Sequence, residues 1–195
     1  MDINQTNHFY RMPCTTRGLE MGERAEPFKQ QLAYDAQRSL YDYWRSKCSP
    51  GKLPSRHDLH PRDMVQFLPF ITLTDVAQAR ARICFRVRLA GTGLRSVLHQ
   101  EITGCTLDEL PFGRQARAQW RQVHERIVAD RTPLCGVTPL VWERSGRAEI
   151  ASLAQFWLKF PLVGEDGKVC AILAYDIFTP LADLSPGLTL RTAHS

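Results

Sequence analysis

The sequence predicts a single α+β domain, and three features of its hydropathy pattern favour this fold class. Five segments show the alternation or the short apolar runs typical of β-strands. Other stretches repeat apolar residues every three or four positions, as amphipathic helices do. The last two strand segments are apolar on both faces, so helices must cover both sides of the sheet. With 195 residues, 44% of them hydrophobic and 23% charged, the chain is long enough to bury a core of its own.

The N-terminal region divides into a tail and a helix. Residues 1–26 are mostly polar and lack periodicity, which indicates a flexible tail. Residues 27–50 are predicted to form an amphipathic helix, which is periodic over 28–47 and ends at the Cys48-Ser-Pro-Gly turn. Its apolar stripe consists of Phe28, Leu32, Ala36, Leu40, Tyr43 and Trp44. Such a stripe can cover its own domain, a second copy of the chain in a homodimer, or both.

The domain itself is predicted to span residues 51–180, followed by a C-terminal tail at 181–195. The pattern predicts, in order, a short helix over 61–68, strands over 70–76 and 83–89, a short helix near 94–98, a longer helix from residue 113, and strands over 139–144, 150–162 and 168–178. Prolines and glycines separate these elements, and the Gly-Glu-Asp-Gly turn at 164–167 is a strong hairpin signal. The central helices can cover one face of the sheet and the 28–47 helix the other.

A ligand pocket is predicted between the sheet and the central helices. Alternation turns one face of the 83–89 strand towards these helices, whose apolar residues can meet it. The pocket hypothesis names Phe85, Val87, Leu89, Leu94, Leu98, Trp120, Val123, Phe156 and Leu158. These walls either close into a filled core or leave a cavity for a small apolar or aromatic ligand, and the sequence leaves both readings open. It identifies no cofactor.

Five segments carry a resemblance to a known family. They are LYDYWR at 40–45, LPSRHDLHP at 53–61, FITLTDV at 70–76, FRVRLAGT at 85–92 and ITGCTLDEL at 102–110. Their order and spacing resemble those of the short stand-alone PAS-like proteins of alphaproteobacteria, over about residues 40–178. The sequence departs from that pattern at Cys105, where the family often has a basic residue. The resemblance implies a five-stranded antiparallel sheet with helices on one face, a sensory or interaction role, and no catalytic residues.

The sequence lacks the patterns of common catalytic and metal sites. It has no Gly-x-Ser-x-Gly turn, and the His124-Glu pair lacks the second histidine that a helical zinc site needs. His57 and His60 lie near Cys48 in a loop bounded by prolines, but their spacing fixes no metal geometry. His99 and His124 are candidates for a haem ligand and fit better as polar residues at helix edges. We expect neither a metal nor catalysis.

The net charge of +5 permits an acidic partner. Arg114, Arg117 and Arg121 share one helix face, and Arg86 and Arg88 project from one strand. The alternative function is therefore a nucleic-acid or anion binder. Neither a helix-turn-helix pattern nor an aromatic stacking platform accompanies these arginines, which favours a solvated face over nucleic-acid binding. Nucleic-acid binding would fall steeply with salt, whereas binding in an apolar pocket would not.

The cysteines and the hydropathy profile predict a cytoplasmic protein. Six cysteines are scattered singly, several of them within apolar segments, and no C-x-x-C pair occurs. This distribution favours free thiols in a reducing compartment. The longest apolar run, at 169–175, is far shorter than the ~20 residues that span a bilayer. The first residues also lack the basic start and apolar stretch of a secretory signal.

Together these patterns predict a non-enzymatic sensory or signalling module. A small ligand or a partner protein would change the packing of the 28–47 helix by binding one arrangement better than the other. The output would then pass to another signalling protein through protein–protein interaction. A small enzyme is a third reading, and an acid–base pair converging in the pocket would support it.

Overall fold

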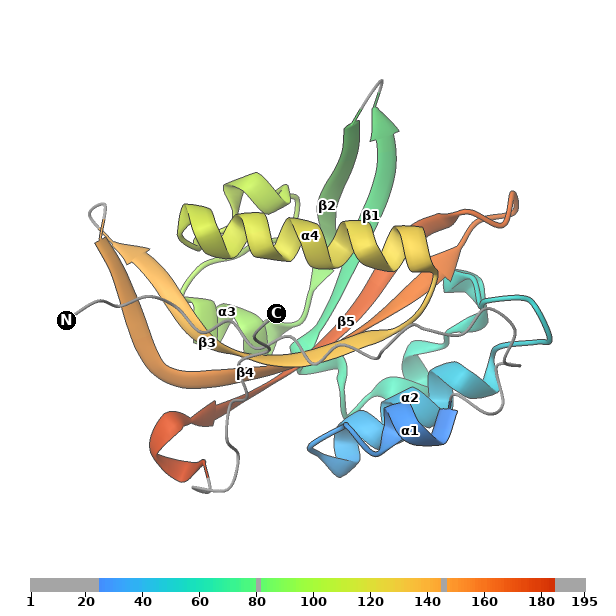
Figure 1. Cartoon of the computed structure of the whole chain (residues 1–195), viewed down its shortest axis with the longest axis horizontal. Helices are drawn as coiled ribbons and strands as arrows, with labels where there is room; N and C mark the ends of the chain where they lie inside the picture. Colours follow the sequence, from blue (N-terminus) through green and yellow to red (C-terminus); the bar gives the residue numbers. More distant parts are fainter. Residues whose placement is uncertain (1–24, 80–81, 145–146, 185–195) are drawn as a thin grey trace, which may run out of the picture.

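The computed structural model describes residues 25–79, 82–144 and 147–184, which form a five-stranded sheet with helices on both faces (Figure 1). The strands are β1 (Ile71–Ala79), β2 (Arg82–Ala90), β3 (Leu134–Arg144), β4 (Arg147–Val163) and β5 (Val169–Pro180). They lie in the order β2-β1-β5-β4-β3, and each neighbouring pair is antiparallel. This topology confirms the α+β fold and the five-stranded antiparallel sheet expected from the sequence.

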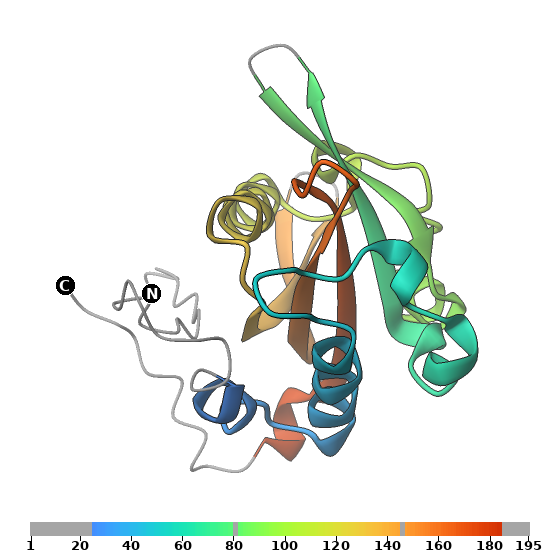
Figure 2. The same ribbon diagram turned by 90° about the vertical axis from the view of Figure 1, so that its right-hand side faces the viewer.

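The helices form two layers, one on each side of the sheet. The helices α1 (Ala25–Lys29) and α2 (Asp35–Ser46) cover one face, and α3 (Thr92–Leu98) and α4 (Arg114–Asp130) cover the other (Figure 2). Short 3-10 helices complete the chain: η1 (Arg56–Asp58), η2 (Pro61–Met64), η3 (Leu68–Phe70), η4 (Leu107–Glu109) and η5 (Leu181–Asp183). Of the two predicted tails, residues 1–24 and 185–195 lie outside the described residues.

The helix predicted over 28–47 is two helices, which are separated near Tyr34. Tyr34 has an extended backbone, with φ −120° and ψ 145°. Its hydroxyl lies 2.6 Å from the Thr179 Oγ1, and its ring meets that of Phe156 edge-on at 5.0 Å. The sequence could not predict this break, because no glycine or proline marks it and the contacts that Tyr34 makes there are with strands far along the chain.

The apolar stripe of the N-terminal helices is buried against the sheet. Its members Phe28, Leu32, Leu40 and Trp44 are buried, and Tyr43 is half-buried. The Trp44 ring stacks on Phe160 of β4 at 5.2 Å, and its Nε1 donates a hydrogen bond to the Pro161 carbonyl at 3.3 Å. The stripe therefore covers its own domain, which is one of the roles that the sequence left open.

A β-bulge in the first hairpin changes the side to which Leu89 faces. Thr74 pairs with Val87 but Leu73 pairs with Leu89, so Arg88 is an extra residue in β2. Regular alternation would keep Leu89 on the face of Val87, and the extra residue places it on the opposite face. Leu89 is 47% exposed, whereas Val87 is 2% exposed. Leu89 is therefore not a wall of the predicted pocket.

The strand β3 begins at Leu134 and not at Pro139, where the sequence predicted its start. Pro139 pairs with Ala154 inside the strand, and the register shifts between Pro139 and Val141. Because β3 is at the edge of the sheet, a residue without an N–H is tolerated there. The proline that suggested a strand start is instead an interior residue beside a bulge.

Gly91, directly after β2, allows two backbone segments to approach closely. Its N–H donates to the Ile71 carbonyl at 2.8 Å. A Cβ at this position would lie 2.1 Å from the Leu68 carbonyl oxygen and 2.4 Å from that of Pro69. Its φ of −65° is ordinary, so the site needs the small size of glycine and not its conformational freedom.

We expect Gly91→Ala to lower the free energy of unfolding by about 1–3 kcal/mol, as over-packing against an unyielding neighbour does. Urea denaturation measures this change. Gly164→Ala is the matched control, because its Cβ would meet only the movable Asp166 carboxylate at 3.3 Å and the Cys170 side chain beyond it. Equal losses in the two variants would contradict the role assigned to Gly91.

Candidate functional site

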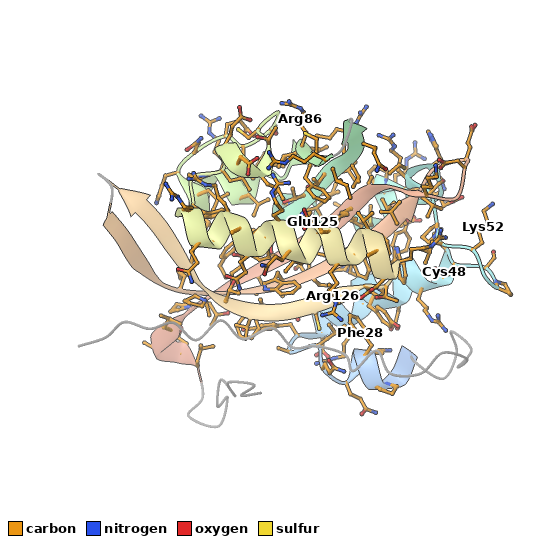
Figure 3. The ribbon with its side chains drawn as sticks, turned by 45° about the horizontal axis from the view of Figure 1, so that its top comes forward. Phe28, Cys48, Lys52, Arg86, Glu125 and Arg126 are labelled. Atoms are coloured by element: carbon orange, nitrogen blue, oxygen red, sulfur yellow. The ribbon has the colours of Figure 1, made fainter. Side chains whose placement is uncertain are left out.

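A cavity of about 50 Å³ lies between the sheet and the helices α3, η4 and α4. Its apolar walls include Val87, Leu94, Leu98, Leu107, Phe112 and Trp120. Its polar lining consists of Thr72, Thr74, His124, Gln155, Lys159 and Asp176. Figure 3 shows the side chains that gather between α4, where Glu125 is labelled, and β2, where Arg86 is labelled.

Three buried polar side chains of β4 and β5 form the floor of this cavity. Gln155 and Lys159 are on the same face of β4 because they are four residues apart. Asp176 of β5 pairs with Trp157, between them, so it shares that face. The three are 7%, 6% and 4% exposed, respectively. The Gln155 Nε2 donates to the Asp176 Oδ1 at 2.8 Å, which satisfies part of the hydrogen-bonding capacity of the carboxylate.

The Lys159 ammonium lies over an aromatic ring. Its Nζ is 4.7 Å from the centroid of the Trp120 ring. Burial lowers the pKa of Lys159, and the negative charge of Asp176 opposes this shift. Burial likewise raises the pKa of Asp176, opposed by Lys159 and by the hydrogen bond from Gln155. The environment therefore disfavours the charged form of both groups, as expected for ionisable groups removed from water.

His124 of α4 lies beside the cavity as a neutral imidazole. Its Nδ1–H donates to the Trp120 carbonyl at 2.6 Å, and its ring packs on Phe85 at 5.2 Å. Burial and then the positive charge of Lys159 lower its pKa from 6.5 to about 3. With the proton on Nδ1, the Nε2 is an acceptor.

This buried histidine predicts loss of stability in mild acid. The unfolded chain binds a proton at His124 with a pKa of 6.5 and the folded chain only near 3, so its contribution is full above pH 6.5 and is lost as the pH falls towards 3. At pH 5 the loss is about 2 kcal/mol. Asp176, with its raised pKa, makes the unfolding free energy rise as the pH falls. The contribution of His124 is therefore measured by comparing variants. His124→Phe should reduce the difference in unfolding free energy between pH 7 and pH 5 by about 2 kcal/mol.

The exposed His57 provides the control for that measurement. His57→Gln shows whether the loss of any histidine, and not of the buried one in particular, changes the difference between pH 7 and pH 5. Urea denaturation of the three proteins at both pH values gives the comparison. An unchanged pH difference in His124→Phe would mean that His124 is not held neutral.

The structure brings some of the predicted pocket residues together and separates others. Val87, Leu94, Leu98 and Trp120 line the cavity. Phe85 and Val123 are buried in the surrounding core. Phe156 and Leu158 lie on the opposite face of β4, where Phe156 contacts Tyr34. Both faces of β4 are apolar, and the sequence pattern alone assigned the wrong one to the pocket.

The floor residues Gln155, Lys159 and Asp176 were absent from the predicted pocket. A signal for them exists in the sequence, because Gln155 and Lys159 flank Trp157 at a spacing of two, in a strand predicted to be covered on both faces. Polar residues at such positions must be buried. His124 follows Trp120 by four residues and so shares its helix face.

Several of the arginines have structural partners. Arg121 donates to the Asp108 carboxylate at 2.7 Å and to the Ile83 carbonyl at 3.3 Å. Arg117 donates to the Leu110 carbonyl at 3.3 Å. These contacts tie α4 to η4 and β2. On β2, Arg86 donates to the Gly104 carbonyl and Arg88 to the Asp75 carboxylate. The arginines that suggested a basic face are thus partly engaged within the domain.

The thiols and the exposed histidines do not form a site in the described part of the chain. Cys48, Cys84, Cys105, Cys135 and Cys170 are free, and Cys14 lies outside the described residues. Burial raises the pKa of Cys48 to about 11 and that of Cys135 to about 12, so these thiols are protonated and unreactive at neutral pH.

Residues 25–79, 82–144 and 147–184 contain no group of three or more histidine, cysteine or acidic side chains that could hold a metal ion. His57 and His60 are exposed there, and His99 is exposed at the C-terminal end of α3. Among the same residues, no helix has the length and apolar character needed to cross a membrane.

A family profile described as a PAS domain matches residues 32–175 of this chain. The match spans β1 to β4 and the part of β5 up to Tyr175, so it includes Gln155 and Lys159 of the cavity floor and ends one residue before Asp176. A search of curated proteins returned no significant match.

Solved structures share low sequence identity with this chain. A variant of RsLOV is 13% identical, with a TM-score of 0.40 and coverage of 63% of this chain and 65% of its own. An RNA-binding light-oxygen-voltage receptor is also 13% identical, with a TM-score of 0.41 and coverage of 62% and 33%. A variant of Vivid is 15% identical, with a TM-score of 0.39 and coverage of 75% and 94%. The chain thus spans less than two thirds of the first two proteins.

Proposed function

Because this chain belongs to the PAS domain family, whose profile matches residues 32–175, we propose that it is a non-catalytic sensory module that binds a small ligand in the cavity under α4. The bound state is passed on through protein–protein interaction, with another signalling protein as the recipient. We propose the cytoplasm as its compartment, since the five described cysteines are free thiols that suit a reducing environment.

One observation carries this proposal: the floor of the cavity holds Lys159 and Asp176, both more than nine-tenths buried. Burying ionised groups costs several kcal/mol each, and apolar residues of similar size are often as stable or more so. Stability alone therefore does not explain these residues. Buried charges that line a cavity are typical of sites that recognise a ligand or carry out chemistry.

The strand β4 offers a route from the cavity to the N-terminal helices. Lys159 faces the cavity, and its neighbours Phe160 and Pro161 contact Trp44 of α2 on the other face. A ligand that moves β4 at Lys159 therefore also moves the surface on which α2 packs. This supports the view that ligand binding biases the position of α2, provided that the two positions differ in ligand affinity.

A small enzyme is the second candidate, because Lys159, Asp176 and His124 are proton-carrying groups lining one cavity. Sensing is preferred because Asp176 and His124 are already hydrogen-bonded to protein partners, and Lys159 lies against an aromatic ring. The Trp120 ring faces Lys159, Gln155 binds Asp176, and the Trp120 carbonyl binds His124. The third candidate is a protein that binds nucleic acid or another anion through its arginines. Such binding should weaken steeply as the salt concentration rises.

Native mass spectrometry of the purified full chain tests the proposed function. We expect the protein to carry a bound small molecule that has the same mass before binding and after release. An enzyme would instead release a product of different mass. Leu98→Phe narrows the cavity and should reduce the adduct. Ser96→Phe is the matched control, since it places the same side chain on the exposed side of α3. Ligand sensing in this cavity would be contradicted if the two variants retained equal amounts of the small molecule, or if the original protein retained none. The same spectra report whether the chain is a homodimer.

A further inference from the structure

The Lys159 ammonium is the cavity group with the least compensation by the protein. It is 6% exposed and lines the cavity. Among the described residues its neighbour is the Trp120 ring at 4.7 Å, and it forms neither a hydrogen bond nor an ion pair with a carboxylate there. Asp176 lies on the adjacent strand, two residues beyond Ala174, which pairs with Lys159. Its carboxylate accepts its hydrogen bond from Gln155.

The ammonium has the Trp120 ring and the negative charge of Asp176 to offset its burial, but no hydrogen-bond acceptor among the described residues. A cation–π contact contributes about 0.5–2 kcal/mol. Removing an ammonium from water costs several kcal/mol. A ligand that brings a negatively charged acceptor to the Nζ would form a charge-assisted hydrogen bond in a site of low dielectric, where such bonds are strong. The ammonium, which lacks a hydrogen-bond acceptor among the described residues, therefore selects for an anion.

The remaining walls select for an apolar chain of small size. Leu94 and Leu98 of α3, Leu107 of η4 and Phe112 face the cavity from the side opposite the sheet. A volume of about 50 Å³ is a third of the roughly 150 Å³ of a cavity that binds benzene. This space fits a few heavy atoms and not an aromatic ring system.

Resting on the proposed function, we propose that the cavity binds a short-chain monocarboxylate, with its carboxylate on the Lys159 ammonium and its alkyl chain against α3 and η4. This differs from the apolar or aromatic ligand that the sequence suggested. Asp176 lies beside the bound carboxylate. Because burial raises the pKa of Asp176, it can take up a proton on binding, which keeps Lys159, Asp176 and the ligand neutral as a set.

Three probes of nearly equal size separate the ligand charges: propionate, propionamide and propylammonium. Titration of the full chain followed by NMR chemical shifts gives an apparent Kd for each. We expect propionate to bind at least about tenfold more tightly than propionamide, since a hydrogen bond to a charged group is stronger than a neutral one. We expect propylammonium to bind more weakly than both, because it would meet the Lys159 charge.

Variants test whether Lys159 is the anchor, meaning the group that binds the carboxylate of the ligand. Lys159→Met keeps the chain length and removes the charge, and it should weaken propionate binding by about 10- to 100-fold with little effect on propionamide. Lys168→Met makes the same change on a side chain that is 82% exposed, and it should leave both unchanged. If Lys159→Met fails to fold, Lys159→Met combined with Asp176→Val removes both charges, and propionate should then lose its advantage over propionamide.

Each contrary outcome has a definite meaning. Equal binding of propionate and propionamide would show a merely apolar pocket, and tighter binding of propylammonium would make Asp176 the anchor. Either result overturns the inference, as does the absence of a saturable shift with propionate. If native mass spectrometry still finds a different small molecule, the sensory proposal stands and the carboxylate assignment alone is lost.

Discussion

Trp44→Ala is expected to lower the free energy of unfolding by about 3–5 kcal/mol, the range for removing a large buried aromatic side chain. Trp44 is 2% exposed and its ring packs against those of Tyr41 and Phe160, at 6.3 and 5.2 Å. The substitution also removes the donor to the Pro161 carbonyl, and an unpaired buried acceptor adds to the loss. Urea denaturation followed by far-UV circular dichroism measures the change.

Tyr43→Ala is the matched control one residue earlier on the same helix. Tyr43 is half-buried, and its hydroxyl accepts from the His60 N–H at 2.8 Å. We expect Tyr43→Ala to cost about 1 kcal/mol, as for the loss of one hydrogen bond and a little packing. If Trp44→Ala costs no more than Tyr43→Ala, α2 is not an integral cover of the sheet, and the proposed route from the cavity to α2 loses its basis.

The fold was predictable from the sequence where local pattern and final environment agree. The helix α4 follows its apolar line through Trp120, Val123 and Ile127, all buried. The capping box between Thr106 and Glu109 is a second feature of this kind. These features depend on residues close in the chain. The break at Tyr34 depends on Thr179, which is 145 residues away, and short-range periodicity contains no information on such a contact.

The candidate site was predictable in its helical half and at Val87 of β2. Leu94, Leu98 and Trp120 were placed correctly at the cavity because each is the apolar face of a helix. The rest of the strand half was not predictable, for two physical reasons. Leu89 is turned away by a one-residue bulge, and a single extra residue reverses every later side chain. In β4 both faces are buried, so hydropathy alone could not choose between Phe156 and Lys159.

The buried charges give the second large effect. Asp176→Val is expected to lower the free energy of unfolding by about 3–5 kcal/mol, because it leaves Lys159 buried without its counter-charge. Lys159→Met combined with Asp176→Val removes both charges. It should be as stable as the original protein or up to about 4 kcal/mol more stable, since apolar side chains can fill the space without a desolvation cost. Urea denaturation at pH 7 compares the three proteins.

Asp166→Val is the control for Asp176→Val, since the exposed Asp166 carboxylate lies in the β4–β5 turn. Asp166 makes a surface ion pair with Lys168 and accepts from the Lys168 backbone N–H at 3.0 Å. Such contacts contribute about 0–1 and about 0.5–1.5 kcal/mol, so a loss of about 1–2 kcal/mol is expected, below that of Asp176→Val. If the double variant is several kcal/mol less stable than the original protein, Lys159 and Asp176 serve the fold, and their burial no longer argues for a ligand. If it is equally or more stable and no longer retains the small molecule, the two charges weaken the fold in exchange for recognition, as binding sites commonly do.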